Sequence, residues 1–513
     1  MPARVLDLLH RYRGWLLGAW LMHAVALHAL FIGVPSWDGF TYHYPPAIEL
    51  VQHGSLGLDK FWVFPFQGLV PVAELVHVPL LAVLGLPSLL ITGPLIVFPL
   101  CVVGVYKLGR KLTGSVHGGN LAGLAYAAIP VINQQPFAGY VDYIVTAALA
   151  YLIYGLLELR DTSRPYRAAI RIVVAMAIVT LTKSSGLYVA GALCAPLLVV
   201  LWREGMPRRL LGVAVAALAV GALPALTIQI LKTIHYGSPI YPFQLTILGI
   251  KIGPGVPAKE MFRQSGLADE TWFEMGRNFI AGWIWPPGRP FSFYDSRSLG
   301  GGWVLVIAVG LLPAFLRSAS RFEKLLVICC VLVSVAARDF WYPRWSFSLT
   351  VAICVVVARA IPELARGGRG RWQFWLAGGL VVLHFLRPAY DLSQLQQPGG
   401  IGPRIDLIGS PWFRWGPAAI APMEDLHARF VIVDYTQDGF LLPLYGRHLT
   451  NEVLFTIPRS QLGPRCDAMR FLVARDPTAV WVDDLDLTAE CERRCAIPSQ
   501  WGPCRGWSLF ASP

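Results

Sequence analysis

Residues 14–46 read GWLLGAWLMHAVALHALFIGVPSWDGFTYHYPP, and this stretch decides the class of fold. Its apolar part, residues 14–34, is about as long as a helix needs to be to cross a bilayer. A basic patch at residues 4–13 precedes it and no small-residue cleavage site follows, which predicts an uncleaved first span. The acidic and aromatic patch at residues 37–46 follows directly, so Asp38 lies at the membrane edge, where ionisable groups are costly and usually functional.

The composition extends this interpretation to the whole chain. Of the 513 residues, 55% are hydrophobic and 14% are charged, with a mean hydropathy of +0.53, which is typical of a polytopic membrane protein. The net charge of +12 does not indicate a nucleic-acid partner, because the excess lies in residues 1–386. From Arg387 onward there are 12 basic and 14 acidic residues. The positive excess therefore follows the rule that basic loops stay on the cytoplasmic side.

Apolar stretches predict about 11 spans, and the charges between them predict the orientation. Basic connections alternate along the chain and all fall on the side of the N-terminus, which places the N-terminus in the cytoplasm and the tail in the periplasm. The predicted spans are residues 14–34, 86–107, 117–134, 140–158, 168–182, 186–202, 209–231, 301–317, 324–337, 345–361 and 372–386.

Two long periplasmic connections are expected, at residues 35–85 and 232–300. The apolar run at 69–86 is assigned to juxtamembrane helices, because a full span there would move the basic pair Arg110 and Lys111 to the periplasmic side. The abundance of Arg over Lys hints at a GC-rich bacterial genome. We therefore expect a multi-pass protein of the bacterial inner membrane, in contact with membrane lipids.

The tail has the composition of a soluble domain. Residues 1–386 are expected to form the transmembrane domain and residues 387–513 a small periplasmic α/β domain, with buried strands near Arg429–Tyr435 and Thr478–Asp483. Four cysteines in an oxidising compartment predict one or two disulfides of undetermined pairing, and a zinc site is the competing interpretation. These cysteines are Cys466, Cys491, Cys495 and Cys504.

The polar side chains expected at the periplasmic membrane edge form a set of mixed charge. Carboxylates such as Asp38 and Asp142 could act as a general base on a hydroxyl, and cations such as Lys183 could hold a phosphate whose charge grows as it leaves. Such a set suits a donor linked to a lipid phosphate. The other members are His43, Glu49, Glu74, His77, Lys232, His235, Arg338 and Arg344.

Several short motifs occur in an order that resembles the glycosyltransferase C superfamily. The resemblance is to its bacterial branch, similar to the protein O-mannosyltransferases and lipid A aminoarabinose transferases, and it covers most of the chain. The motifs are Trp37-Asp38-x-x-x-Tyr42-His43-x-Pro45, Glu74-Leu75, Tyr140-Val141-Asp142, Thr182-Lys183, Tyr236-Gly237-Ser238-Pro239 with Tyr241-Pro242, and Tyr342-Pro343-Arg344-Trp345.

The resemblance implies a polyprenyl-phosphate-linked sugar as donor and inverting transfer to a hydroxyl of a periplasmic glycan, lipid or protein acceptor. It implies that Asp38 is the general base, that Asp142 and Glu74 help to shape the acceptor and metal-or-cation environment, and that Lys183 and Arg344 hold the lipid phosphate. The remaining residues expected to bind substrate are Tyr42, His43, Lys232, His235 and Arg338.

Alternatives to each assignment stay open. Asp38 and Asp142 could cap helices, and Lys183 could reach toward the interface from the end of a span. His43, His77 and Glu74 could hold a divalent cation, although no cofactor and no metal site is expected. At the level of the whole protein, the alternatives are a lipid-linked sugar transporter or flippase and an oligosaccharide ligase.

Overall fold

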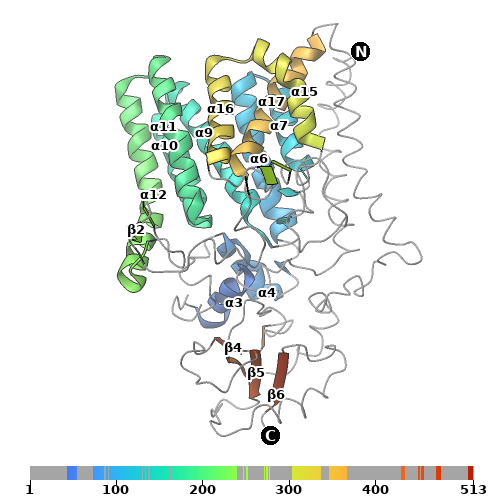
Figure 1. Ribbon diagram of the computed structural model, residues 1–513, viewed down its shortest axis with the longest axis vertical. Helices are drawn as coiled ribbons and strands as arrows, with labels where there is room; N and C mark the ends of the chain where they lie inside the picture. The colour runs from blue at the N-terminus through green and yellow to red at the C-terminus, as the bar shows by residue number, and fades with distance from the viewer. Residues whose placement is uncertain are drawn as a thin grey trace, which may run out of the picture.

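In a computed structural model of the chain, the larger elements form one helix bundle with smaller elements beyond one end (Figure 1). The structure describes residues 43–54, 73–85, 88–89, 92–129, 131–132, 135–136, 139–161, 163–239, 246–247, 250–251, 253, 271, 273–274, 276–277, 303–336, 346–366, 429–433, 449–450, 452–455, 469–474 and 507–511.

Six described helices are long and apolar enough to cross a membrane. They match the spans predicted at 86–107, 140–158, 168–182, 186–202, 209–231 and 345–361, because long apolar runs are the strongest signal in such a sequence. Their apolar ranges are Thr92–Thr113, Asp142–Asp161, Pro165–Thr182, Ser185–Arg203, Arg208–Ile234 and Phe347–Leu364.

The bundle consists of η4 and the described helices from α6 to α17, whose bounds are given at the end of this paragraph. Three helices of 13 to 16 residues, α7, α15 and α16, coincide with the predicted spans 117–134, 301–317 and 324–337. The predicted spans 14–34 and 372–386 lie outside the described residues. The bundle elements are η4 (Thr92–Val97), α6 (Phe98–Thr113), α7 (Val116–Ala128), α9 (Asp142–Asp161), α10 (Pro165–Thr182), α11 (Ser184–Arg203), α12 (Arg208–Tyr236), α15 (Trp303–Ser318), α16 (Arg321–Ala336) and α17 (Phe347–Arg366).

Helix α17 and helix α9 lie at the centre of this bundle. Helix α17 packs against α6, α7, α9, α15 and α16, and its apolar residues belong to the main core. Small residues allow close packing elsewhere: a Cβ at Gly221 of α12 would lie 2.6 Å from the Val173 carbonyl oxygen of α10. Such close approach through small residues is common between membrane helices.

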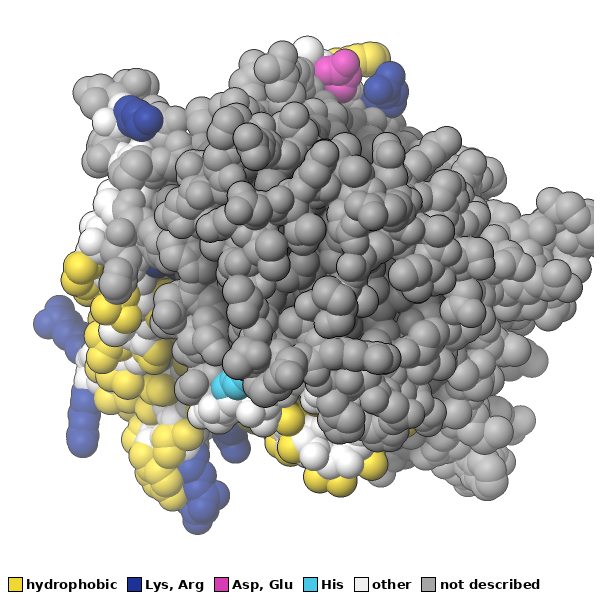
Figure 2. Space-filling view, turned by 90° about the horizontal axis from the view of Figure 1, so that it is seen from below, with side chains coloured by type: hydrophobic (Ala, Val, Ile, Leu, Met, Phe, Trp, Pro, Cys, Tyr) yellow, Lys and Arg dark blue, Asp and Glu magenta, His cyan; other side chains and the backbone are white. Residues whose placement is uncertain are grey.

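The outer flank of α12 is apolar and exposed. Val220, Leu223, Ile230 and Ile234 are all more than half exposed. In the view from below, apolar side chains cover the left flank of the molecule, on the side where α12 lies in Figure 1 (Figure 2). An apolar face of this size on a helix of 29 residues is what a lipid-facing helix requires.

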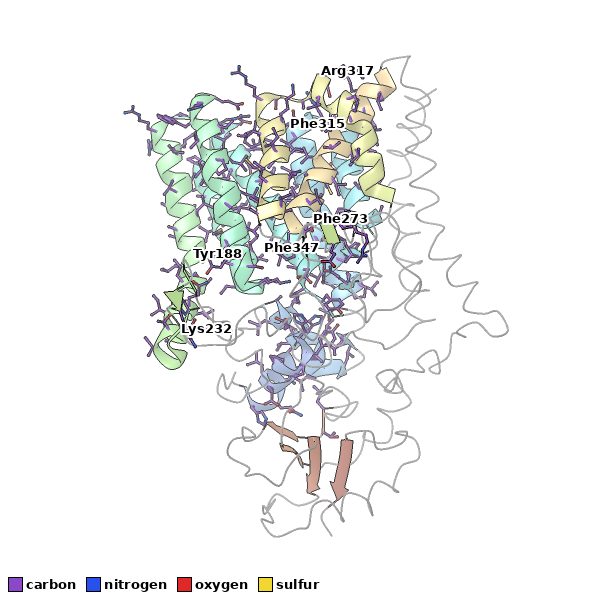
Figure 3. All side chains as sticks on the ribbon, in the orientation of Figure 1. Tyr188, Lys232, Phe273, Phe315, Arg317 and Phe347 are labelled. Atoms are coloured by element: carbon purple, nitrogen blue, oxygen red, sulfur yellow. The ribbon has the colours of Figure 1, made fainter. Side chains whose placement is uncertain are left out.

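The two ends of the bundle differ, and we name them by their charges. The basic end is where α6, α9 and α11 finish, near Lys111, Asp161 and Glu204, and Lys111 pairs with Asp161 at 2.8 Å. The Asp142 end is where α9 begins. Phe347 and Lys232 lie toward the Asp142 end, whereas Phe315 and Arg317 lie toward the basic end (Figure 3).

Short helices lie beyond the Asp142 end (Figure 1). They are α3 (Tyr44–His53), the 3₁₀ turn η2 (Glu74–His77) and α4 (Val78–Leu84). Two prolines open α3, where their missing N–H groups cost nothing, and Gly54 closes it with a positive φ of 66°. The helices η2 and α4 lie within the run 69–86, and they are short, as expected of juxtamembrane segments.

A four-stranded sheet lies farther out on the same side (Figure 1). Its order is β4-β3-β5-β6, formed by β4 (Glu452–Phe455), β3 (Arg429–Val433), β5 (Met469–Ala474) and β6 (Trp507–Ala511). Strand β3 confirms the strand predicted near Arg429–Tyr435, and it pairs parallel with β4 and antiparallel with β5. A smaller hairpin joins β1 (Thr246–Ile247) to β2 (Ile250–Lys251). The segment 478–483 and the four tail cysteines lie outside the described residues.

Candidate active site

A buried ion pair joins the first two short helices beyond the Asp142 end. The Nδ1 atom of His43, just before α3, bonds the Oε1 atom of Glu74 in η2. Both side chains are less than one-tenth exposed. The two residues are 31 positions apart, so the pair fixes the first predicted periplasmic loop at two points.

Tyr44 connects this ion pair to the bundle. Its ring meets the ring of His77 edge-on, with centroids 5.2 Å apart. On its other side the Tyr44 ring presses against Gly139, where a Cβ would lie 2.7 Å from it and where φ is +75°. Only glycine combines that conformation with that closeness, so Gly139 allows α3 to dock against the turn that leads into α9.

Burial keeps the aromatic members of this cluster neutral. Burial and the nearby Glu74 carboxylate both raise the pKa of Tyr44 far above its ordinary value. Burial, and then the neighbouring His43, lower the pKa of His77 from 6.5 to about 4. At neutral pH the phenol of Tyr44 and the imidazole of His77 are therefore uncharged, and they lie beside the Glu74–His43 pair.

The start of α9 is fixed by hydrogen bonds that place Asp142. The backbone N–H of Tyr143 donates to Oε1 of Gln135 at 2.6 Å, which satisfies one of the free donors at a helix N-terminus. The Tyr126 hydroxyl donates to the Tyr143 carbonyl oxygen at 2.6 Å. Asp142 is the first residue of α9, so its carboxylate also gains from the positive end of the helix dipole.

Lys183 forms the second ion pair. It lies between α10 and α11 in extended conformation, and Gly186 permits the tight reversal there, because a Cβ at 186 would lie 2.1 Å from the Val179 carbonyl oxygen. The Lys183 ammonium bonds Oδ1 of Asp142. It also lies 5.1 Å from the centre of the Phe347 ring at the start of α17.

This pair joins three parts of the bundle at one end. The Asp142 side chain is 2% exposed and the Lys183 side chain 28%, so the carboxylate is buried and the lysine side chain is partly exposed. A charge-assisted bond in such surroundings holds the lysine in one place. A fixed, partly exposed ammonium next to a membrane-spanning bundle is suited to binding an anionic headgroup.

The remaining predicted residues are placed as follows. Lys232 is buried near the end of α12, on the Asp142 side (Figure 3). Glu49 is buried in α3 and lies 3.4 Å from His53 Nε2. His235 belongs to α12, but its side chain lies outside the described set, as do Asp38, Tyr42, Arg338 and Arg344.

Three contributors to this arrangement carry no signal that singles them out in the sequence: Tyr44, Gln135 and Phe347. Gly139 could have been noticed, because it precedes the Tyr140-Val141-Asp142 motif.

As for metals, no three His, Cys, Asp or Glu side chains in the described part of the chain are grouped to hold an ion. The described residues therefore do not form the divalent-cation site considered for His43, His77 and Glu74.

Comparison with known proteins finds distant likenesses only. No family model and no curated protein matches the chain. Among solved structures, the oligosaccharyltransferase of Archaeoglobus fulgidus, in complex with zinc and sulfate, is 14% identical with a TM-score of 0.47, over 72% of this chain and 53% of that one. A structure of the oligosaccharyltransferase AglB from Archaeoglobus fulgidus with an inhibitory peptide and a dolichol-phosphate is 13% identical with a TM-score of 0.47, over 87% and 62%.

ArnT from Cupriavidus metallidurans, bound to undecaprenyl phosphate, is 15% identical with a TM-score of 0.47, over 85% of this chain and 75% of that one. This chain thus spans between about half and three quarters of the length of these structures. Because the likeness is this distant, we base the function on the residues of the chain itself.

Proposed function

We propose that the protein is a membrane glycosyltransferase that moves a monosaccharide from a polyprenyl phosphate to a hydroxyl of a periplasmic glycan, lipid or protein. The observation that supports this most is the Asp142–Lys183 pair, which holds an ammonium at the end of a membrane-spanning bundle. The phosphate of a lipid in the adjacent leaflet would lie at about the same depth in the membrane as this ammonium. Phe347 contacts Lys183, and Arg344 lies three residues before Phe347 in the sequence. Arg344 is therefore proposed as a second cation for the phosphate.

In the proposed reaction, Asp38 is the general base. Its carboxylate takes the proton of the acceptor hydroxyl while the acceptor oxygen bonds the anomeric carbon of the sugar, with inversion. The bond from that carbon to the phosphate oxygen breaks, and polyprenyl phosphate leaves with one more negative charge. Lys183 and Arg344 stabilise that growing charge.

The buried pair in the first loop has a supporting role in this proposal. His43 lies five positions after Asp38, and its bond to Glu74 fixes the loop that carries the base. Tyr42, Lys232, His235 and Arg338 are assigned to substrate binding. Asp142 keeps Lys183 in place and, with Glu74, shapes the acceptor side.

The topology in this proposal is that of the bacterial inner membrane. Residues 1–386 form the transmembrane domain of about 11 spans, with the N-terminus in the cytoplasm, and residues 387–513 form a periplasmic α/β domain. The sheet of the tail lies on the same side as α3, and Gln52 Nε2 of α3 donates to the Leu449 carbonyl oxygen at 2.9 Å (Figure 1). This contact supports the placement of the tail next to the first loop.

The test is a transfer assay with purified protein and a panel of polyprenyl-phosphate monosaccharides. At least one should be a donor, and Asp38→Asn should lower the rate by about 10² to 10⁴-fold while the protein remains inserted and folded. Unchanged transfer by this variant would overturn the assignment of Asp38. A transporter or flippase would instead move an intact lipid-linked sugar across vesicles without releasing polyprenyl phosphate.

A further inference from the structure

Helix α6 carries three cations in its last two turns, and they differ in their partners. Lys111 pairs with Asp161 of α9 at 2.8 Å. Lys107 and Arg110 form no ion pair with any carboxylate in the part of the chain that the structure describes. Arg110 is exposed and Lys107 is half-buried. Two of the three charges are therefore left for a partner from outside the described helices.

Lys107 lies inside the part of α6 that can cross a membrane. The spanning range is Thr92–Thr113, and Lys107 is six residues before its end, which is about 9 Å along the helix axis. At that depth the apolar core of a bilayer meets the headgroups, and an ionised side chain is costly there unless an anion or water satisfies it. A lysine in this position extends its ammonium toward the headgroups.

An aromatic pair on α9 holds this ammonium in place. Helices α6 and α9 pack against each other, and Lys107 Nζ lies 5.3 Å from the centre of the Tyr151 ring. Tyr151 stacks on Tyr154 with ring centres 5.5 Å apart. Arg171 of α10 lies 5.9 Å from the centre of the Tyr154 ring, but its charge is already paired with Glu158. Lys107 is therefore the cation of this aromatic pair that has no carboxylate beside it among the described residues.

An exposed apolar stripe on α6 leads to the two cations. Leu100 is 66% exposed and Val103 is 47% exposed. The positions 100, 103, 107 and 110 are three or four residues apart, so these side chains share one face of the helix. That face is apolar toward the middle of the bundle and cationic toward the basic end. A phospholipid with a net negative charge has the same pattern, an acyl chain attached to a phosphate.

We propose that this face of α6 is a binding site for an anionic glycerophospholipid of the cytoplasmic leaflet. Lys107 and Arg110 bind the phosphate, the arginine through its fork of N–H donors, and Leu100 and Val103 contact an acyl chain. The site lies toward the opposite end of the bundle from Lys183, so it is separate from the proposed transfer reaction. Only its assignment to the cytoplasmic leaflet rests on the proposed topology.

The test compares two lipids that have the same acyl chains and differ in headgroup charge. Phosphatidylglycerol is anionic and phosphatidylcholine is zwitterionic, and each is added to the purified protein in a neutral detergent while the rise in melting temperature is followed. The wild type should bind phosphatidylglycerol more tightly. Lys107→Gln and Arg110→Gln should each weaken that binding about fivefold, which is the usual contribution of one cation near an anionic lipid. Phosphatidylcholine binding should stay the same.

Three controls separate this site from a general attraction between anionic lipid and the basic end. Arg317→Gln removes an exposed cation of α15 that also lies toward the basic end, and it should leave the affinity for phosphatidylglycerol unchanged (Figure 3). Lys107→Arg keeps the charge and should bind as the wild type does. Glycerol 3-phosphate, which carries the phosphate without acyl chains, should bind much more weakly than the lipid.

The inference is overturned if Lys107→Gln and Arg110→Gln both bind phosphatidylglycerol as tightly as the wild type. An equal loss in Arg317→Gln would overturn it too, because the attraction would then belong to the whole basic end. Equal affinity of the wild type for the two lipids, or for the lipid and glycerol 3-phosphate, would also contradict the site. If Lys107→Gln does not fold, Arg110→Gln decides the question, since that side chain is exposed. No sugar donor or acceptor takes part, so a negative result would not count against the proposed transfer reaction.

Discussion

The two ends of the helix bundle both carry ion pairs, and the pairs that link separate segments differ in how far they are buried. At the basic end, Lys111–Asp161 and Arg160–Glu204 have side chains that are 26% to 39% exposed. At the Asp142 end, the carboxylates of Glu74 and Asp142 are 7% and 2% exposed. Exposed pairs contribute little to stability, whereas buried charges are costly to desolvate.

The difference supports a separate role for each end. Cations at the basic end agree with the charge pattern that orients a membrane protein, and they require no special surroundings. Keeping ionised groups buried at the Asp142 end requires support from Gln135, Gly139 and Phe347. The basic end also buries one carboxylate, Glu323, which lies 3.7 Å from Arg359, but that side chain caps the start of α16, where it accepts from the Ser320 N–H. The buried pairs at the Asp142 end instead join segments that are 31 and 41 positions apart, which is the basis of our proposal.

The largest effect on stability is expected for Asp142→Asn. This variant leaves the Lys183 ammonium without its anionic partner, and breaking a buried pair should cost about 3 kcal/mol of folding free energy. At the basic end, Asp161→Asn should cost less than about 1 kcal/mol, because its partners are exposed. Unfolding of both variants in detergent measures the difference. Equal losses at the two ends would remove the contrast.

The second effect concerns His77, whose pKa is lowered to about 4. Between pH 6.5 and pH 4 the unfolded chain binds a proton at this imidazole and the folded protein does not, so stability falls as the pH falls through this window. The lowered pKa corresponds to about 3 kcal/mol at most. His77→Gln should show a correspondingly smaller loss of stability between pH 7 and pH 4. Parallel pH curves for variant and wild type would contradict this account.

A smaller effect, on the KM for the lipid donor, is expected when the aromatic ring beside Lys183 is replaced. Phe347→Leu removes the ring beside Lys183 and keeps apolar bulk, so the KM for the lipid donor should rise by about 3- to 30-fold with little change in kcat. Phe347→Trp, which keeps an aromatic ring, should have the KM of the wild type. The matched control is Tyr151→Leu, because Lys107 lies 5.3 Å from that ring in the half of the bundle that bears the basic end. A similar change in KM for the control would show that the effect is not local.

The sequence was sufficient to predict the six long apolar helices, because hydropathy over about 20 residues reports directly on a membrane span. The predicted span 209–231 lies within α12, and the predicted span 140–158 falls within two residues of the start of α9. The basic loops and the strand at Arg429–Val433 were predicted from charge and from β-branched residues in the same way.

The partners within the site could not be predicted, because they depend on tertiary packing. His43 meets Glu74 across 31 positions, and Asp142 meets Lys183 across 41. Both members of each pair were expected in the site, but nothing in their spacing shows which acid binds which base. In the sequence Phe347 resembles an ordinary residue of an apolar helix, and only its contact with Lys183 gives it a role.

The most direct test of the central claim compares lysines at the two ends. Lys183→Gln and Lys111→Gln each remove one ammonium, and the affinity of the purified protein for polyprenyl phosphate is measured for both. We expect Lys183→Gln to bind at least about tenfold more weakly, with Lys111→Gln within twofold of the wild type. Equal affinities for the two variants would contradict the claim that the Asp142 end binds the lipid phosphate.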